Sequence, residues 1–93
     1  MSLKLQNPLK DPSAVLDYVF DWTEWLATGE TITDHTITAD NGITVDSSTE
    51  DAGKVTVWLS GGTAGINYKV ACKITTSAGR TDERTIWIKV VDR

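Results

Sequence analysis

The sequence predicts an all-β fold, an antiparallel β-sandwich of about seven short strands, and three observations support this prediction. Apolar and polar residues alternate along 54–60, 67–75 and 86–91, which is the period of half-buried strands. Glycine-bearing breaks at 61–65 and 78–79 separate these runs, as is typical of tight connections between antiparallel strands. Turn signals recur along the chain at spacings of about 8–12 residues, the pattern of a sandwich.

The last three strands also predict most of the core. A side-chain period of two places alternate residues of each run on one face, so the apolar face is expected to point inward. Leu16 and Phe20, from an earlier strand, are expected to join it. Val55, Leu59 and Val90 belong to these apolar faces, and the predicted core residues of the last three strands are Val57, Tyr68, Val70, Cys72, Ile74, Ile86 and Ile88.

The chain begins with a predicted extended N-terminal arm, residues 1–13, which holds both prolines and admits at most a short edge strand. The sandwich domain is expected to span residues 14–93. Its first strand is predicted over 15–22, where large apolar residues alternate with residues of a wet face.

A single helical turn is predicted directly after this first strand. Three large apolar residues at helical spacing mark it: Trp22, Trp25 and Leu26. Gly29 can adopt the left-handed conformation that stops such a turn, and either Asp21 or Thr23 can cap its beginning.

The middle of the chain predicts two further strands. Thr31–Asp40 has a threonine-rich β composition, and Asp40-Asn41-Gly42 is a turn signal. A short strand is expected at Ile43–Val45 and a polar loop at Ser47–Gly53. Tyr68 follows a glycine-bearing break and begins the next strand, which is the position of a tyrosine corner. Together with the strand spacing, this position of Tyr68 predicts an immunoglobulin-like sandwich, although the second immunoglobulin cysteine is absent.

Length and cysteine content narrow the class of protein. A chain of 93 residues is one domain with one modest core. Its single cysteine, Cys72, leaves no intrachain disulfide and is expected to act as a small core hydrophobe. No apolar run approaches the ~20 residues of a membrane span, and the first residues lack the apolar core of a signal peptide. We therefore expect a protein that folds in a cytoplasm and is not secreted by a signal peptide.

Charge is distributed unevenly along the chain. The net charge is -4, which argues against a nucleic-acid-binding protein. Ten acidic residues and no Lys or Arg lie between Asp11 and Gly53. From Lys54 onward there are seven basic residues and three acidic ones. The folded molecule is therefore expected to be charge-polarised.

Residues that could carry catalysis or bind a metal do not form a recognisable motif. His35 has no nucleophile motif near it, and His35 with Cys72 falls short of the ligand count of zinc. The acids around Asp40-Asn41-Gly42 lack the spacing of a calcium loop. The glycine run at 61–65 lacks the ending of a phosphate loop. The sequence thus predicts no enzyme, no metal and no cofactor.

Four tryptophans in so small a domain are the better functional clue. Trp22 has core parity, and Trp25 is expected to cover an open end of the sandwich. Trp58 and Trp87 have the opposite parity and should point outward, where tryptophan is enriched at protein interfaces. The alternative is that each ring lies flat under neighbouring Lys or Thr side chains.

The last two strands are expected to present the contact surface, with a basic outer face that meets an acidic part of a partner. Their outward residues are Lys69, Ala71, Lys73, Thr75, Trp87, Lys89 and Val91. The candidate partner-contact residues are Trp87, Lys69, Lys73, Lys89 and Trp58.

Several segments together resemble a known family. The segments that carry the resemblance are Lys10-Asp11-Pro12, Leu16-Asp17-Tyr18, Asp21-Trp22 with Trp25-Leu26, Gly42-Ile43, 57–65 and 75–84, of which Leu-Ser-Gly-Gly-Thr-Ala-Gly and Thr-Ser-Ala-Gly-Arg-Thr are the most specific. Through these segments the chain is similar, from about Lys10 to Arg93, to small proteins of tailed bacteriophages and prophages that are labelled fiber-tail adaptor or virion structural protein.

The resemblance implies a non-enzymatic virion protein of the head–tail or tail/fiber region, with no catalytic residue. Its implied partners are other virion proteins, and self-association into a ring is one form that the contact can take; nucleic acid and membrane are not expected partners. The implied location is the virion, after assembly in the host cytoplasm. A second hypothesis is a carbohydrate-binding or adhesive immunoglobulin-like module that uses its outward tryptophans as sugar platforms.

Overall fold

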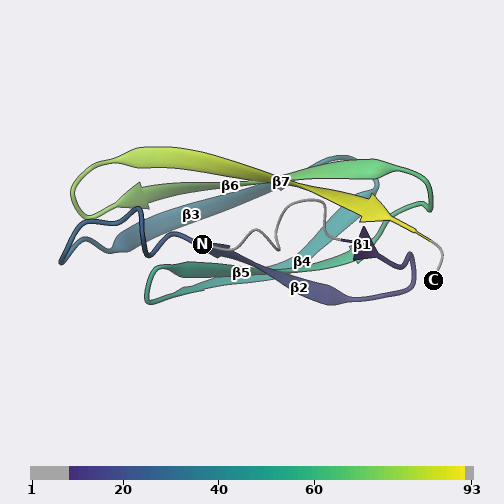
Figure 1. Ribbon diagram of the computed structural model, residues 1–93, viewed down its shortest axis with the longest axis horizontal. Coiled ribbons are helices and arrows are strands. Elements are labelled where there is room, and N and C mark those ends of the chain that lie inside the picture. The colour runs from purple at the N-terminus through teal and green to yellow at the C-terminus, as the bar shows by residue number, and fades with distance from the viewer. Residues whose placement is uncertain (1–8, 92–93) are drawn as a thin grey trace.

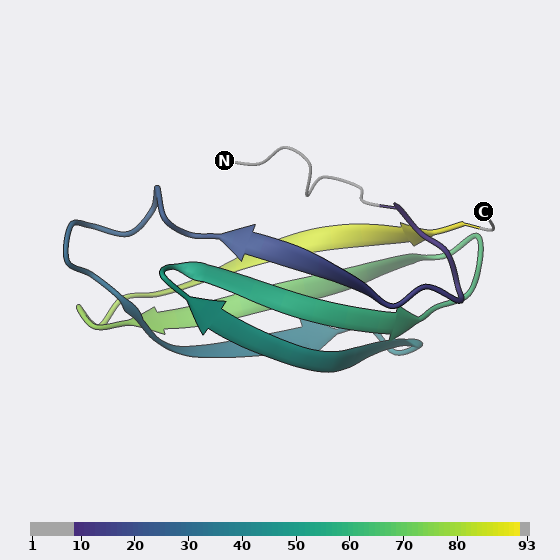
Figure 2. The same cartoon turned by 90° about the horizontal axis from the view of Figure 1, so that it is seen from below.

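The computed structural model describes residues 9–91 and consists of two β-sheets packed face to face (Figures 1 and 2). These residues form strands, turns and bends, without a helix. The strands are β1 (Leu9–Lys10), β2 (Leu16–Asp21), β3 (Ile32–Ala39), β4 (Ile43–Asp51), β5 (Lys54–Gly61), β6 (Asn67–Thr76) and β7 (Thr81–Val90). The predicted all-β sandwich is confirmed.

The two sheets differ in the number of their strands. Sheet A has the order β1-β7-β6-β3 and sheet B the order β2-β5-β4. All neighbouring strands are antiparallel except β1, which adds to β7 in parallel over two residues. Within residues 9–91, six strands of six to ten residues build the sandwich. The predicted count of about seven is reached only if the two-residue β1 is included.

The core lies between the sheets and contains the apolar face of each long strand. Every predicted core residue of β5, β6 and β7 is buried, as is Phe20 of β2. Leu16 was expected there too, but its side chain is 36% exposed. Its inward parity is correct, yet it is the first residue of an edge strand, where neighbouring residues give less cover.

The predicted polar loop at Ser47–Gly53 is wrong. β4 continues through this segment to Asp51 and pairs with β5, with a register shift between Val45 and Ser47. The backbone ladder to β5 holds this polar edge strand, so apolar alternation is not needed. Ala52 and Gly53 alone form the turn, with φ of 52° and 88°, the two positive φ angles that a tight two-residue hairpin requires.

The predicted helical turn after β2 is confirmed. The backbone N–H of Leu26 donates to the Trp22 carbonyl at 3.0 Å, which closes one turn. Asp21 is the cap, since its Oδ1 accepts the Thr23 backbone N–H at 2.9 Å. The Ala78-Gly79 turn is also confirmed, although β7 starts five residues before the predicted Ile86, at Thr81.

Tyr68 makes the expected corner contact at the start of β6. The backbone N–H of Thr63 donates to the Tyr68 hydroxyl at 2.8 Å. A Cβ at Gly42 would lie 2.9 Å from the ring, and one at Gly62 would meet both the ring and Val90. Glycine at both positions therefore lets the backbone approach the ring closely.

Part of the predicted N-terminal arm lies against the sandwich. Residues 1–8 lie outside the described residues, but Lys10 is fully buried beside β7. Its ammonium donates to the carbonyls of Gly61 at 2.6 Å and Asp11 at 2.9 Å. Burial lowers the pKa of Lys10, against the attraction of Asp11 and Asp46. No pattern in the sequence predicted a buried lysine.

Candidate contact surfaces

The outer face of sheet A gathers four of the five candidate contact residues. We call this set, Lys69, Lys73, Trp87 and Lys89, the lysine face. Lys69 lies directly opposite Trp87 across the β6–β7 pair, and Lys89 is the next outward residue of β7. Trp87 points outward as predicted, with 49% of its surface exposed.

The lysine face has acidic neighbours at both ends. Lys69 and Lys89 flank Trp87, but the Asp40 carboxylate accepts the Lys69 backbone N–H at 2.8 Å, and Glu83 lies opposite Lys73. Ala71, also outward, pairs with Thr85 and is buried among its neighbours because it is small. The face therefore presents one large aromatic ring near ammonium groups, beside the smaller side chains of Ala71 and Thr85.

Trp58, the fifth candidate, lies on the other side of the molecule. It is on β5, the central strand of sheet B, and is 42% exposed. Asp17 of β2 and Ser47 of β4 lie opposite it on the two neighbouring strands. The five candidates thus do not form one surface, because parity predicts an outward side chain but not the sheet that carries it.

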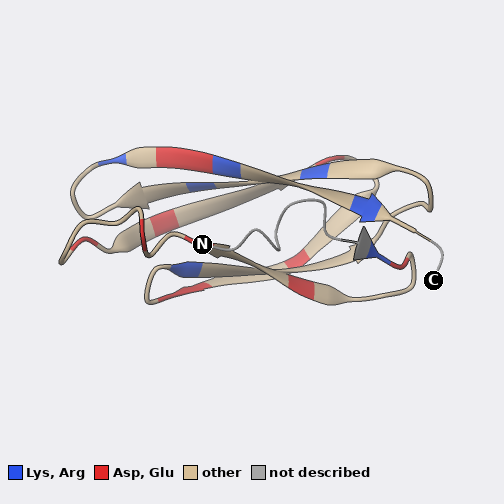
Figure 3. Ribbon diagram, viewed as in Figure 1, with Lys and Arg blue, Asp and Glu red and all other residues tan. Residues whose placement is uncertain are grey.

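The outer face of sheet B that carries Trp58 also carries acidic residues, of which Asp17 lies directly opposite Trp58. We call the set Asp17, Asp21, Asp46, Asp51 and Trp58 the aspartate face. Asp46 accepts a hydrogen bond from the Ser60 hydroxyl at 2.9 Å, and Lys54 lies opposite both Asp21 and Asp51. Figure 3 shows acidic segments on β2, β3 and β4 and basic segments on β5, β6 and β7, with Asp82 and Glu83 as the acidic part of β7.

Two tryptophans and two arginines form a cluster at one end of the sandwich. Trp22 is buried, and its ring meets Trp25 edge-on at 5.5 Å. The Arg84 guanidinium lies 4.2 Å from the Trp22 ring centre, and that of Arg80 lies 4.0 Å from the Trp25 ring centre. Each pair has the geometry of a cation–π contact.

Glu30 fastens this cluster to the β6–β7 hairpin. Its carboxylate pairs with Arg80, whose Nε donates at 2.9 Å, and accepts the Thr76 hydroxyl and the Ala27 backbone N–H. Arg80, then Thr76 and Ala27, lower the pKa of Glu30 to about 2. The cluster holds the segment after β2 in place, and both Trp25 and Arg80 already have partners within the domain.

His35 and Cys72 lie on the paired strands β3 and β6, two residue pairs apart in the register. His35 Nε2 lies 3.1 Å from the Ser48 hydroxyl, across the gap between β3 and β4. Cys72 is fully buried, and burial raises the pKa of its thiol to about 11. A thiol that remains protonated near neutral pH is a poor nucleophile.

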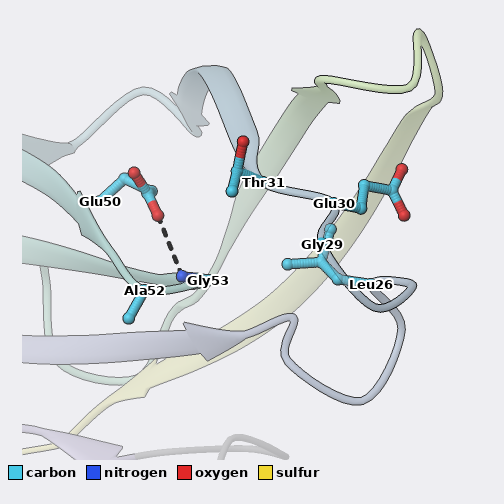
Figure 4. Close-up of a pocket in the computed structure, with 7 residues that line it drawn as sticks. All are labelled: Leu26, Gly29, Glu30, Thr31, Glu50, Ala52 and Gly53. Atoms are coloured by element: carbon cyan, nitrogen blue, oxygen red, sulfur yellow. Dashed lines mark hydrogen bonds between the residues drawn. The ribbon is translucent and has the colours of Figure 1, made fainter.

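Two open depressions lie near the β4–β5 turn. The larger has a volume of about 440 Å³ and is lined by Leu26, Gly29, Glu30, Thr31, Glu50, Ala52 and Gly53 (Figure 4). The smaller, of about 340 Å³, is lined by Ile32, Thr33, Asp34, His35 and Glu50.

The carboxylates around the larger depression already have partners. Glu50 accepts the Gly53 backbone N–H at 3.0 Å, and Glu30 is paired with Arg80. In the part of the chain that the structure describes, no three His, Cys, Asp or Glu side chains are grouped to hold a metal ion. Neither depression includes Trp58 or Trp87 in its lining.

Comparison with known proteins identifies the family. The model of the family described as podophage GP4 fiber-tail adaptor protein gp77 matches residues 10–89. The chain belongs to this family. The match runs from Lys10 of β1 to Lys89 of β7 and so covers both sheets and both tryptophan-bearing faces.

Membership of the fiber-tail adaptor family confirms the resemblance seen in the sequence and gives the protein a structural role in a phage virion. An adaptor of a phage tail contacts other virion proteins, and the family is consistent with a protein that is not an enzyme. A search of curated proteins gave no match. Within residues 9–91, no helical segment has the length and apolar character needed to cross a membrane.

Proposed function

We propose that this fiber-tail adaptor is a non-enzymatic, immunoglobulin-like module of the head–tail or tail/fiber region that acts through protein–protein contacts. The family match supports the virion role. The observation that supports the contact mechanism is Trp87, a large aromatic side chain left 49% exposed on a regular sheet among lysines. Exposed aromatic residues on rigid elements are the usual anchors of protein interfaces.

The strand order supports the immunoglobulin-like assignment. When the seven strands are lettered A to G in chain order, sheet B has the order B-E-D and the long strands of sheet A the order G-F-C. These are the central sets of the two immunoglobulin sheets. The corner contact of Tyr68 at the start of the sixth strand agrees with it. One difference is that β1 pairs with β7 rather than with β2.

The lysine face is the proposed contact surface for other virion proteins. Its basic residues fit an acidic surface, which a neighbouring tail protein or a further copy of this chain can supply. Opposite charges would mainly steer and orient the encounter, while Trp87 would provide the buried anchor. A head-to-tail contact between copies would build a ring if its rotation closes.

The chemistry of the side chains supports a non-enzymatic role. Burial keeps the Cys72 thiol protonated, and a protonated thiol is a poor nucleophile. The carboxylate of Glu30, which lines the larger depression, is fixed by Arg80.

Phage assembly with altered adaptors tests this function. Trp87→Ala combined with Lys69→Glu and Lys73→Glu should reduce incorporation of the adaptor, and of whatever it attaches, into virions. Ile66→Ala is the matched control, because Ile66 is a similarly exposed apolar residue outside both faces. Virions that assemble normally with all three changes would rule out the lysine face.

The carbohydrate-binding alternative rests on the same outward tryptophans. A flat exposed indole is a suitable platform for a sugar ring, and both Trp58 and Trp87 are available in the domain. A glycan array probed with the purified protein separates the two proposals. Binding of a glycan that is lost in Trp87→Ala or Trp58→Ala would favour the alternative.

A further inference from the structure

We infer that the aspartate face is a second contact surface and that its occupant is the lysine face of another copy of this chain. The inference rests on the proposed function, in that the lysine face is a contact surface. It adds the reciprocal surface and the geometry of the resulting assembly. The chain would then act as a repeating unit rather than as a single link.

The position of Trp58 is the first support. It stands on the central strand of sheet B, where β2 and β4 hydrogen-bond to β5 on either side and hold it rigid. Its exposed fraction, 42%, is close to the 49% of Trp87. Each face therefore offers one preorganised aromatic side chain that can be buried at little entropic cost.

Charge complementarity is the second support and points to the occupant. The aspartate face carries four acids against one base, Lys54, which lies at its far end opposite Asp21 and Asp51. The lysine face carries three bases; Glu83 lies opposite Lys73, and the Asp40 carboxylate accepts the Lys69 backbone N–H at 2.8 Å. Trp58 has Asp17 opposite it, whereas Trp87 has Lys69. When the two faces meet, aspartates around one ring can lie against lysines around the other.

The layered architecture is the third support, because it keeps the two surfaces apart. The sheets lie one above the other, so their outer faces point in opposite directions (Figure 1). An interface of standard size buries about 800 Å² per partner, roughly one seventh of the 5443 Å² surface of this chain. Both faces can therefore be occupied at once.

This arrangement determines the form of the assembly. The contact joins two different surfaces, so an open assembly of any length has one unoccupied lysine face at one end and one unoccupied aspartate face at the other. Because the two faces point in opposite directions, successive copies stack sheet A on sheet B. Such a stack extends until a rotation between copies closes it into a ring or another virion protein covers its end.

Self-association of the purified full-length chain tests the inference. Sedimentation velocity over a concentration series at low ionic strength should show growth beyond the monomer that weakens with added salt. Trp58→Ala should weaken it by about tenfold or more, the effect of removing a buried aromatic anchor. Ile66→Ala, with a similarly exposed apolar side chain, should leave it unchanged. Circular dichroism establishes that each variant folds.

Two charge-reversed variants give a sharper test. The first reverses the aspartate face with Asp17→Lys and Asp46→Lys, and the second reverses the lysine face with Lys69→Glu and Lys73→Glu. Each alone should remain a monomer. An equimolar mixture should associate, because the first variant keeps an intact lysine face and the second an intact aspartate face.

Two results would overturn the inference. The first is a wild-type chain that stays monomeric at low ionic strength, and the second is a Trp58→Ala chain that associates like the wild type. If the wild type is monomeric and its Trp58→Ala variant fails to enter virions, the aspartate face would be assigned to a different virion protein. Each of these leaves the proposed adaptor function standing, since that function is tested by virion incorporation of the lysine-face variants.

Discussion

Tyr68 is the single residue that best connects sequence to fold. Its hydroxyl accepts the Thr63 N–H, while its ring fills the space left by Gly42 and Gly62. Tyr68→Phe keeps the ring and removes only the acceptor, so the Thr63 N–H loses its partner. We expect a loss of about 0.5–1.5 kcal/mol in the free energy of unfolding, measured by urea denaturation.

Thr63→Ala is the control for this prediction. It removes an exposed side chain and leaves the backbone N–H that donates to Tyr68 in place. Its midpoint should stay close to that of the wild type. A Tyr68→Phe midpoint that also stays there would mean that the hydroxyl contributes nothing to the corner.

Glu30 predicts a specific dependence of stability on pH. Its pKa is lowered from 4.5 to about 2 in the folded state, because Arg80, Thr76 and Ala27 all stabilise the ionised carboxylate. A group with a lowered folded pKa contributes its full stabilisation above its unfolded pKa. That contribution is therefore present above about pH 4.5 and disappears as the pH falls toward 2.

The measurement is the melting midpoint of the wild type and of Glu30→Gln between pH 6 and pH 2. The two curves should lie apart at pH 6 and converge below about pH 4.5, since the wild type loses on protonation what the variant already lacks. Asp51→Asn, at the exposed end of β4, serves as the matched control. Parallel Glu30→Gln and wild-type curves would show that ionisation of Glu30 does not contribute to the pH dependence of stability.

At the scale of elements, β2 and β7 show where the core ends. Ile88 of β7 is fully buried, whereas Leu16 of β2 is 36% exposed despite its inward parity. Ile88→Ala leaves a cavity and should cost about 2–5 kcal/mol, most of the stability of a small domain. Leu16→Ala should cost much less. Equal losses in chemical denaturation would show that Leu16 belongs to the core after all.

The long strands were predictable because each has one apolar face. β5 and β6 bury alternate residues along almost their whole length, and β7 does so from Ile86 to Val90; this alternation is visible in the sequence. β4 lacks it beyond Val45, because its serines, threonines and acids are held by the backbone ladder to β5. A polar edge strand carries no periodic signal, so its second half resembled a loop.

The candidate contact residues were predictable only as outward side chains. Parity identifies Trp58 and Trp87 as exposed, but the assignment of β5 to sheet B and β7 to sheet A depends on long-range pairing. The Glu30–Arg80 pair joins residues 50 positions apart, and no local pattern reports it. The burial of Lys10 likewise depends on the Gly61 carbonyl at the far end of β5.

For the whole molecule, the lysines and the tryptophan of the lysine face are expected to affect different rates of binding. Lysines on the outer face act at long range, so Lys69→Glu with Lys73→Glu should slow association, and added salt should reduce the difference. Trp87 acts only after contact, so Trp87→Ala should mainly speed dissociation. Surface plasmon resonance against the binding partner separates the two rates. Charge reversal that changes only dissociation would contradict this division.

The buried thiol of Cys72 can serve as a probe of how often the folded domain opens. It is the only cysteine in the 93 residues and lies on β6, inside sheet A, with no exposed surface. A thiol reagent can reach it only when the two sheets separate, so the rate of its modification counts opening events rather than surface chemistry. Under oxidising conditions, folded copies packed side by side in a particle would remain free of disulfide links through this residue. A covalent dimer of the chain would therefore record copies that had unfolded.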